Sequence, residues 1–226
     1  DRSDRSTYKL LGGSIGFYGS TLNTRQYATK GYLEKLIAQV FTGRERFEPG
    51  NPQEGYSPSP QERQSWLQIS YMKEAYHTMG PKFTLGWMAE ALYSSKNFSE
   101  NYTATMMQAG EFAPTPHSKL MYNEAFRANQ YVAAGIKPIY VLNDMFQFRT
   151  EFYGFTPIFP IKKNALNKAY YGKAFSRFEY MGEVSVICHL PFGAISAYVN
   201  HYSSPRREWN VGMTIGWQLF NYRFVE

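Results

Sequence analysis

The sequence predicts an all-β protein, and three observations carry this prediction. Apolar and polar side chains alternate with a period of two through most of the 226 residues, which is the period of a β-strand. No stretch reaches the roughly 18 apolar residues that a membrane-spanning helix needs. Charged residues make up 19% of the chain and aromatic residues 18%, which suits strands with one apolar and one polar face.

Nine strands are predicted. The first two alternate less regularly than the other seven, in which apolar residues at every second position oppose polar ones. The last is the clearest, because its odd-numbered residues are apolar and its even-numbered residues are polar or glycine over eleven positions. The nine ranges are 8–22, 32–47, 65–77, 83–93, 131–137, 144–155, 183–190, 193–202 and 209–220.

The connections between these strands are of two lengths. Short ones fall at 143–144 and 191–193, and long ones at 48–62, 96–128 and 158–169. Alternating short and long connections are typical of outer-membrane barrels, in which tight turns face the periplasm and long loops face outward. The sequence therefore predicts a transmembrane antiparallel β-barrel with long extracellular loops.

A soluble sandwich or lipocalin-like barrel has the same period and is the alternative. The polar faces of the predicted strands argue against it, because charges are intolerable in a dry core but normal in a water-filled lumen. We therefore expect the apolar faces to contact lipid and the polar faces to line a wet lumen. The charges on the polar faces belong to Glu74, Glu90, Lys137, Arg149 and Glu151.

Single-chain bacterial barrels normally have an even number of strands, whereas nine are predicted here. In a sheet with two free edges, the unpaired backbone groups would find no water to hydrogen-bond within a bilayer. We expect residues 1–226 to form one barrel domain that is incomplete at its N-terminus.

The net charge of +6 comes from dispersed Lys and Arg, so nucleic acid is not an expected partner. The single Cys188 and four His residues show no metal-ligand spacing, and no metal or other cofactor is expected.

Several segments together resemble the barrel of the patatin-like phospholipases of Bacteroidota, which belong to the BamA-type superfamily of outer-membrane assembly and secretion barrels. Examples are FAPTPHSK at 112–119, FRTEFYGF at 148–155 and LPFGAISAYVNHY at 190–202. The other segments are 24–50, 123–140 and the end of the chain from Trp209.

The resemblance implies an N-terminal patatin hydrolase domain, a short periplasmic domain and a sixteen-stranded barrel, of which these would be the last nine strands. It implies a place in the bacterial outer membrane and a part in lipid metabolism, with any lipid acyl hydrolysis in a domain absent from this sequence. The implied partners are outer-membrane lipids, the barrel assembly machinery and other outer-membrane or secretion proteins. The barrel would anchor the hydrolase and export or present it. The alternatives are a BamA-like pore for protein insertion or translocation, without an enzyme domain, and a passive porin.

Two further features of BamA-type barrels have counterparts here. An arginine at the tip of a long loop folds into the lumen and contacts an acidic residue, and Arg127 with Glu151 resembles this pair, although Ala128 and Asn129 depart from the motif. The C-terminal targeting strand is matched by a polar, glycine, apolar and aromatic pattern. That pattern is Asn210, Gly212, Ile215, Trp217 and Phe220.

One motif suggests catalysis. Residues 12–16 fit G-x-S-x-G, the turn that exposes a nucleophilic serine between a strand and a helix. Here Ser14 is followed by Phe17 and Tyr18, which continue a strand pattern, and no acid or base is in register with it. We therefore expect a glycine-rich strand and no catalytic residue in this chain.

Overall fold

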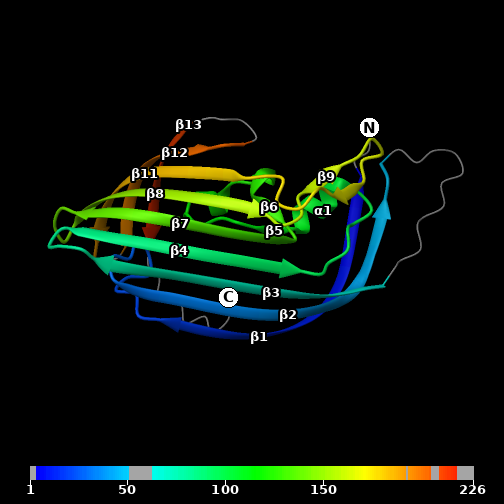
Figure 1. Cartoon of the computed structure of the whole chain (residues 1–226), viewed down its shortest axis with the longest axis horizontal. Coiled ribbons are helices and arrows are strands. Elements are labelled where there is room, and N and C mark those ends of the chain that lie inside the picture. Colours follow the sequence, from blue (N-terminus) through cyan, green and yellow to red (C-terminus); the bar gives the residue numbers. More distant parts are fainter. Residues whose placement is uncertain (1–3, 51–62, 192, 205–208, 218–226) are drawn as a thin grey trace, which may run out of the picture.

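Nine consecutive strands form one antiparallel sheet. The structure is a computed structural model that describes residues 4–50, 63–191, 193–204 and 209–217. The order is β1-β2-β3-β4-β7-β8-β11-β12-β13, so each strand pairs with its neighbour in the chain (Figure 1). They are β1 (Arg5–Ser20), β2 (Gly31–Glu48), β3 (Arg63–Thr78), β4 (Phe83–Ser94), β7 (Gln130–Val141), β8 (Phe146–Pro157), β11 (Glu179–Leu190), β12 (Gly193–Tyr202) and β13 (Trp209–Trp217). The all-β prediction is confirmed, and all nine predicted strands are present.

The connections lie at two ends of the sheet. At one end are the brief turns 79–82 and 142–145, the short connection between β11 and β12, and the ten-residue connection 21–30 between β1 and β2. The other end carries the long connections (Figure 1). One of them, 95–129, contains helix α1 (Tyr102–Gln108), two 3-10 turns, and the short strands β5 (Gly110–Glu111) and β6 (Arg127–Ala128). A second contains the hairpin of β9 (Ile161–Lys163) and β10 (Ala169–Tyr171).

The two faces of the sheet differ as the alternation predicts. The register pairs outward-facing apolar residues across strands, as at Val40 with Leu67 and Val199 with Val211. On the convex face these side chains are exposed: Ile15 is 78% and Val211 79% accessible. The concave face instead carries the buried residues of the structure. In the described part of the chain, no helix has both the length and the apolar character that crossing a bilayer requires.

The concave side is filled by the connection 95–129. Phe112 and Phe126 from this segment are both 2% exposed and pack against Tyr131, Tyr153 and Phe155 of β7 and β8. The Phe112 and Phe155 rings stack with centroids 5.9 Å apart. This aromatic cluster forms the main hydrophobic core, and it fastens the long connection to the sheet.

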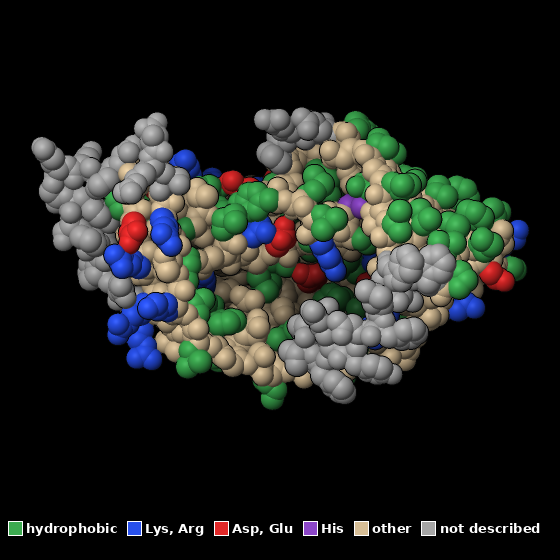
Figure 2. Space-filling view, turned by 180° about the vertical axis from the view of Figure 1, so that it is seen from behind, with side chains coloured by type: hydrophobic (Ala, Val, Ile, Leu, Met, Phe, Trp, Pro, Cys, Tyr) green, Lys and Arg blue, Asp and Glu red, His purple; other side chains and the backbone are tan. Residues whose placement is uncertain are grey.

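The sheet ends in two free edges within the described residues. β1 pairs with β2 alone and β13 with β12 alone. β1 is exposed along most of its length on both faces. Seen from behind, the molecule is hollowed on the side that the curved sheet leaves open, with Lys, Arg, Asp and Glu side chains inside the hollow (Figure 2). The fold is therefore a curved open sheet whose concave side is partly filled by the connections 21–30 and 95–129.

Candidate functional site

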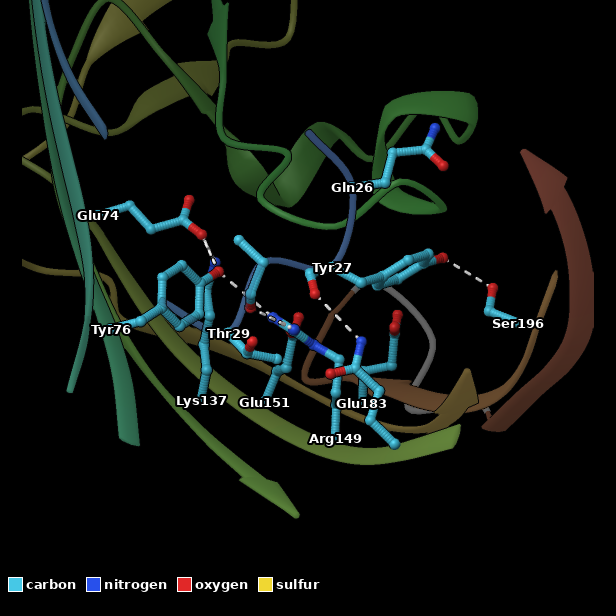
Figure 3. A network of polar contacts seen from close by, with 12 residues as sticks. Gln26, Tyr27, Thr29, Glu74, Tyr76, Lys137, Arg149, Glu151, Glu183 and Ser196 are labelled. Atoms are coloured by element: carbon cyan, nitrogen blue, oxygen red, sulfur yellow. Dashed lines mark hydrogen bonds and ion pairs between the residues drawn. The ribbon is translucent and has the colours of Figure 1, made fainter. Parts of the chain in front are cut away.

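A network of charged side chains lies on the concave face of the middle strands. Arg149 and Glu151 come from β8, Lys137 from β7, and Glu74 and Tyr76 from β3 (Figure 3). Residues two apart on a strand face the same way, so the alternation alone directs Arg149 and Glu151 inward together. The four charged members were predicted to face inward but not to meet one another, and Tyr76 was not singled out from the sequence.

Arg149 and Glu151 form the centre of the network. An Arg149 Nη2 to Glu151 Oε1 distance of 2.9 Å joins them, and Arg149 Nε donates to the same oxygen at 2.9 Å. Tyr153 donates its hydroxyl to the other carboxylate oxygen, Oε2, at 2.7 Å. The two charged side chains are only 2% and 7% exposed. Burying two charges is costly, so this geometry requires that each remain paired.

A second ion pair closes the network toward β3. Lys137 Nζ lies 3.0 Å from Glu74 Oε1, and Tyr76 donates its hydroxyl to the same carboxylate. The Lys137 ammonium also lies 5.8 Å from the centroid of the Tyr76 ring and equally far from that of Tyr153. Two cations thus face two carboxylates, which keeps the cluster neutral. The prediction of a wet lumen is wrong for Lys137, Arg149 and Glu151, which are at most 6% exposed. The connection 21–30 lies against Arg149, and Phe112 of the connection 95–129 packs on Tyr153, which bonds Glu151.

Side chains of β8 donate hydrogen bonds to the connection between β1 and β2, which we call the inner turn (residues 21–30). Arg149 Nη1 donates to the carbonyl oxygen of Ala28 at 2.9 Å, and Gln147 Nε2 donates to that of Tyr27 at 3.1 Å. The Tyr27 hydroxyl lies 2.7 Å from the Ser196 hydroxyl on β12 (Figure 3). Burial raises the pKa of Tyr27, so this residue remains a neutral hydrogen-bonding group. The inner turn is therefore tied to strands on two sides of the concave face.

A buried histidine ties the long connection 95–129 to the sheet. His117 Nδ1 lies 2.8 Å from Glu183 Oε2 on β11, and both side chains are at most 4% exposed. The imidazole stacks on Tyr198 of β12. Among the described residues, its Nε2 atom has no hydrogen-bond partner, and neither does the hydroxyl of Ser185, which lies two residues from Glu183 on β11. A Ser-His-acid triad needs a hydrogen bond between those two atoms, so this group does not form one.

The predicted pair of Arg127 with Glu151 is wrong. Arg127 Nη2 instead lies 2.6 Å from Glu111 Oε2, and its Nη1 donates to the carbonyl oxygen of Met107 at 3.1 Å. The reason is local: β5 and β6 pair so that Glu111 and Arg127 are opposite each other, whereas Glu151 already has Arg149 two residues away on its own strand. Burial raises the pKa of Glu111, and the Arg127 charge opposes that rise.

The C-terminal strand has the predicted faces where it is described. Ile215 is outward and 63% exposed, and Gly212 faces inward against the Tyr198 ring. Asn210 pairs with Asn200 on β12. The backbone of Trp217 pairs with Gly193, but the Trp217 side chain and all of Phe220 lie outside the described residues. A targeting role for this strand stays a prediction.

Residues 12–16 form no nucleophile turn. Ser14 lies within β1 opposite Gln39, and the strand continues on both sides of it. In the ranges that the structure describes, no three His, Cys, Asp or Glu side chains gather in a way that suits a metal ion. The side chains of this site therefore have a structural role: their ion pairs and hydrogen bonds hold the connections 21–30 and 95–129 against the concave face of the sheet.

Comparisons with family models, with curated proteins and with solved structures find no match for this chain.

Proposed function

We propose that this chain is part of an outer-membrane β-barrel, in which the convex face of the sheet contacts lipid and the concave face encloses the inner turn and the connection 95–129. The observation that carries the proposal is the contrast between the faces. Large apolar side chains are exposed along the convex face from β1 to β13, whereas charged residues are buried on the concave face. A soluble protein rarely exposes so continuous an apolar surface.

The strand lengths support the same proposal. β8 and β11 have 12 residues each, which at about 3.3 Å per residue is roughly 40 Å along the strand. A tilt of about 40° shortens this to about 30 Å across the membrane, close to the hydrocarbon thickness of a bilayer. In the proposed barrel, further strands pair with the edges of β1 and β13, because unpaired backbone groups are not tolerated in lipid.

The finer proposal is that the barrel anchors and presents a lipid acyl hydrolase domain of the patatin type, which is absent from the sequence given. The segments that resemble the Bacteroidota patatin-like phospholipases support it. The second candidate is a BamA-type insertion or translocation pore without such a domain. The filled concave side favours an anchor, since two connections occupy the space that a permanently open channel needs.

Tryptophan quenching by brominated lipid tests the proposed membrane contact. Trp87 lies on the outward face of β4, and Trp66 lies inward on β3 and is 8% exposed. Two single-tryptophan variants, each with the other three Trp residues changed to Phe, are reconstituted in vesicles. We expect dibrominated phosphatidylcholine to quench Trp87 strongly and Trp66 weakly. Equal quenching of the two, or none, would overturn the proposal.

A further inference from the structure

A short hairpin at the end with the long connections carries a concentrated positive charge. Residues 158–174 contain four lysines and no Asp or Glu, and β9 and β10 form the hairpin at its centre. We call this segment the basic hairpin. Its lysines are Lys162, Lys163, Lys168 and Lys173, and all four are exposed. Lys and Arg side chains gather at this end of the molecule (Figure 2).

Among the described residues, three of these four lysines have no carboxylate partner, and the fourth has a distant one. Lys168 Nζ lies 4.0 Å from Glu100 Oε2, at the limit of an ion pair and on the surface. For Lys162, Lys163 and Lys173, no carboxylate of the described residues lies within ion-pairing distance, whereas Lys137 and Arg149 are each paired. The positive charge of the basic hairpin is therefore available to an external anion.

Exposed apolar side chains lie within the hairpin and beside it. Leu166, Tyr170, Phe175 and Phe178 are all exposed. The Phe178 ring covers Gly154 on the outward face of β8, because a Cβ atom on Gly154 would lie 3.0 Å from that ring. The apolar convex surface thus continues up to the hairpin. Lysines above an apolar surface are the arrangement found at the boundary between lipid and water, where the aliphatic stems lie in the apolar layer and the ammonium groups reach outward.

The hairpin is held in a defined position. Ile161 is 3% exposed and packs with Met106 and Ala109 beneath it. The Asn164 Oδ1 atom accepts hydrogen bonds from the backbone of Leu166 and of Lys168, both at 2.9 Å, and so fixes the tip. A ligand of these lysines would not have to order the hairpin first, which avoids an entropic cost of binding.

We propose that the basic hairpin binds the phosphate groups of anionic lipid headgroups in the leaflet at this end of the barrel, with Leu166, Phe175 and Phe178 in the interfacial layer. The charge of the lysines is complementary to phosphate, and the apolar residues continue the surface that faces the acyl chains. This inference rests on the proposed function, because it requires the convex face to lie in a membrane.

The test measures transfer of a fluorescent phosphatidylglycerol from neutral detergent micelles onto the purified full chain. Each lysine near an anionic surface contributes about fivefold in affinity at low salt, so Lys162→Gln/Lys163→Gln should weaken binding about 25-fold. The control Lys30→Gln/Lys82→Gln removes the same charge at the opposite end and should leave the affinity unchanged. Lys162→Arg/Lys163→Arg should retain binding, and a fluorescent phosphatidylcholine should bind equally to all variants.

Three results would overturn this inference. The first is unchanged affinity in Lys162→Gln/Lys163→Gln. The second is an equal loss in the control, which would mean attraction by net charge alone. The third is full displacement of the lipid by millimolar inorganic phosphate, which would mean a site for the free anion. Quenching of Trp87 by brominated lipid does not depend on the basic hairpin. If Trp87 is not quenched, the proposed function is wrong. If Trp87 is quenched and any of these three results is found, only the proposed lipid binding by the hairpin is wrong.

Discussion

At the scale of single residues, the pair of Arg149 and Glu151 is the most consequential contact of the concave face. Because both side chains are buried, Glu151→Gln leaves an uncompensated guanidinium away from water. Breaking a buried pair from one side costs about 3–5 kcal/mol of the free energy of unfolding. Equilibrium unfolding in urea, with the chain folded into detergent or short-chain lipid, measures this loss.

The pair of Arg127 and Glu111 supplies the matched control. Its side chains are 12% and 28% exposed, so Glu111→Gln should cost nearer the ~1 kcal/mol of surface pairs. If Glu111→Gln and Glu151→Gln lower the free energy of unfolding by similar small amounts, the network around Arg149 is not buried. The water-filled lumen predicted from the sequence would then be correct.

Lys96 gives the chain a distinct dependence on pH. Burial lowers its pKa from 10.5 to about 8, and the nearby Glu45 charge only partly opposes this. The folded chain therefore binds fewer protons than the unfolded chain between these values. The cost of burying the charged ammonium is fully present below about pH 8 and is relieved as the pH rises toward 10.5.

Relative to Lys96→Met, the wild-type free energy of unfolding should therefore increase over that pH range. Chemical unfolding of both proteins at pH 7.5 and at pH 10, on either side of the folded pKa of about 8, measures this change in the free energy of unfolding. A constant difference between the two proteins would show that Lys96 is not desolvated by folding.

At the scale of elements, β13 tests the assignment of faces most simply, because adjacent residues face opposite sides. Met213 is 67% exposed on the convex face, and Thr214 faces inward. Met213→Arg should cost about 2–4 kcal/mol if the residue lies near the middle of a bilayer, and Thr214→Arg much less. The folded fraction of each variant in a heat-modifiability gel measures this. Equal fractions would contradict the assignment.

The inner turn depends on one glycine. Gly31 begins β2 with φ of +90°, and a Cβ atom there would lie 2.2 Å from the carbonyl oxygen of Thr21. Gly31→Ala should therefore destabilise the fold by about 1–3 kcal/mol, since alanine rarely adopts this conformation. Gly13→Ala is the control, because a Cβ atom at Gly13 meets no atom within 4 Å. If the two variants unfold at the same urea concentration, the turn is not constrained as described.

The elements themselves were largely predictable, because a period of two is a local signal that each strand carries by itself. The strands extend beyond the predicted ranges mainly where the alternation fades, as in β7, where Pro138 interrupts it yet pairing continues to Val141. The contacts between elements were not predictable. Arg149 reaches the backbone carbonyl of Ala28, 121 residues away, and no side-chain pattern marks such an acceptor.

The failed pairing of Arg127 has a similar cause. The order of charges along the chain did not distinguish Glu111 from Glu151 as its partner, because β5 and β6 are two residues long and too short to show a period. The four lysines of the basic hairpin, by contrast, could have been recognised from the sequence as a run without acidic residues.

At the scale of the whole molecule, the described residues combine an apolar convex surface, a concave face with buried ion pairs, and two strand edges without a partner. On the concave face, the buried charges form ion pairs with one another, and the connections 21–30 and 95–129 pack over this face. The apolar surface has no such cover among the described residues, and the proposed role in the outer membrane depends on lipid covering it. Contact between the convex face and lipid is therefore the central claim.

Spin labels along β11 test that claim most directly. In a Cys188→Ser background, single cysteines replace Val184, Ser185, Val186 and Ile187 in turn, and the labelled chains are reconstituted in vesicles. Val184 and Val186 are outward and exposed, whereas Ser185 and Ile187 are buried. We predict that collisions with oxygen, which concentrates in lipid, are frequent at 184 and 186 and rare at 185 and 187. More frequent collisions with a water-soluble nickel chelate than with oxygen at 184 and 186 would mean that the convex face is in water, and would contradict the account.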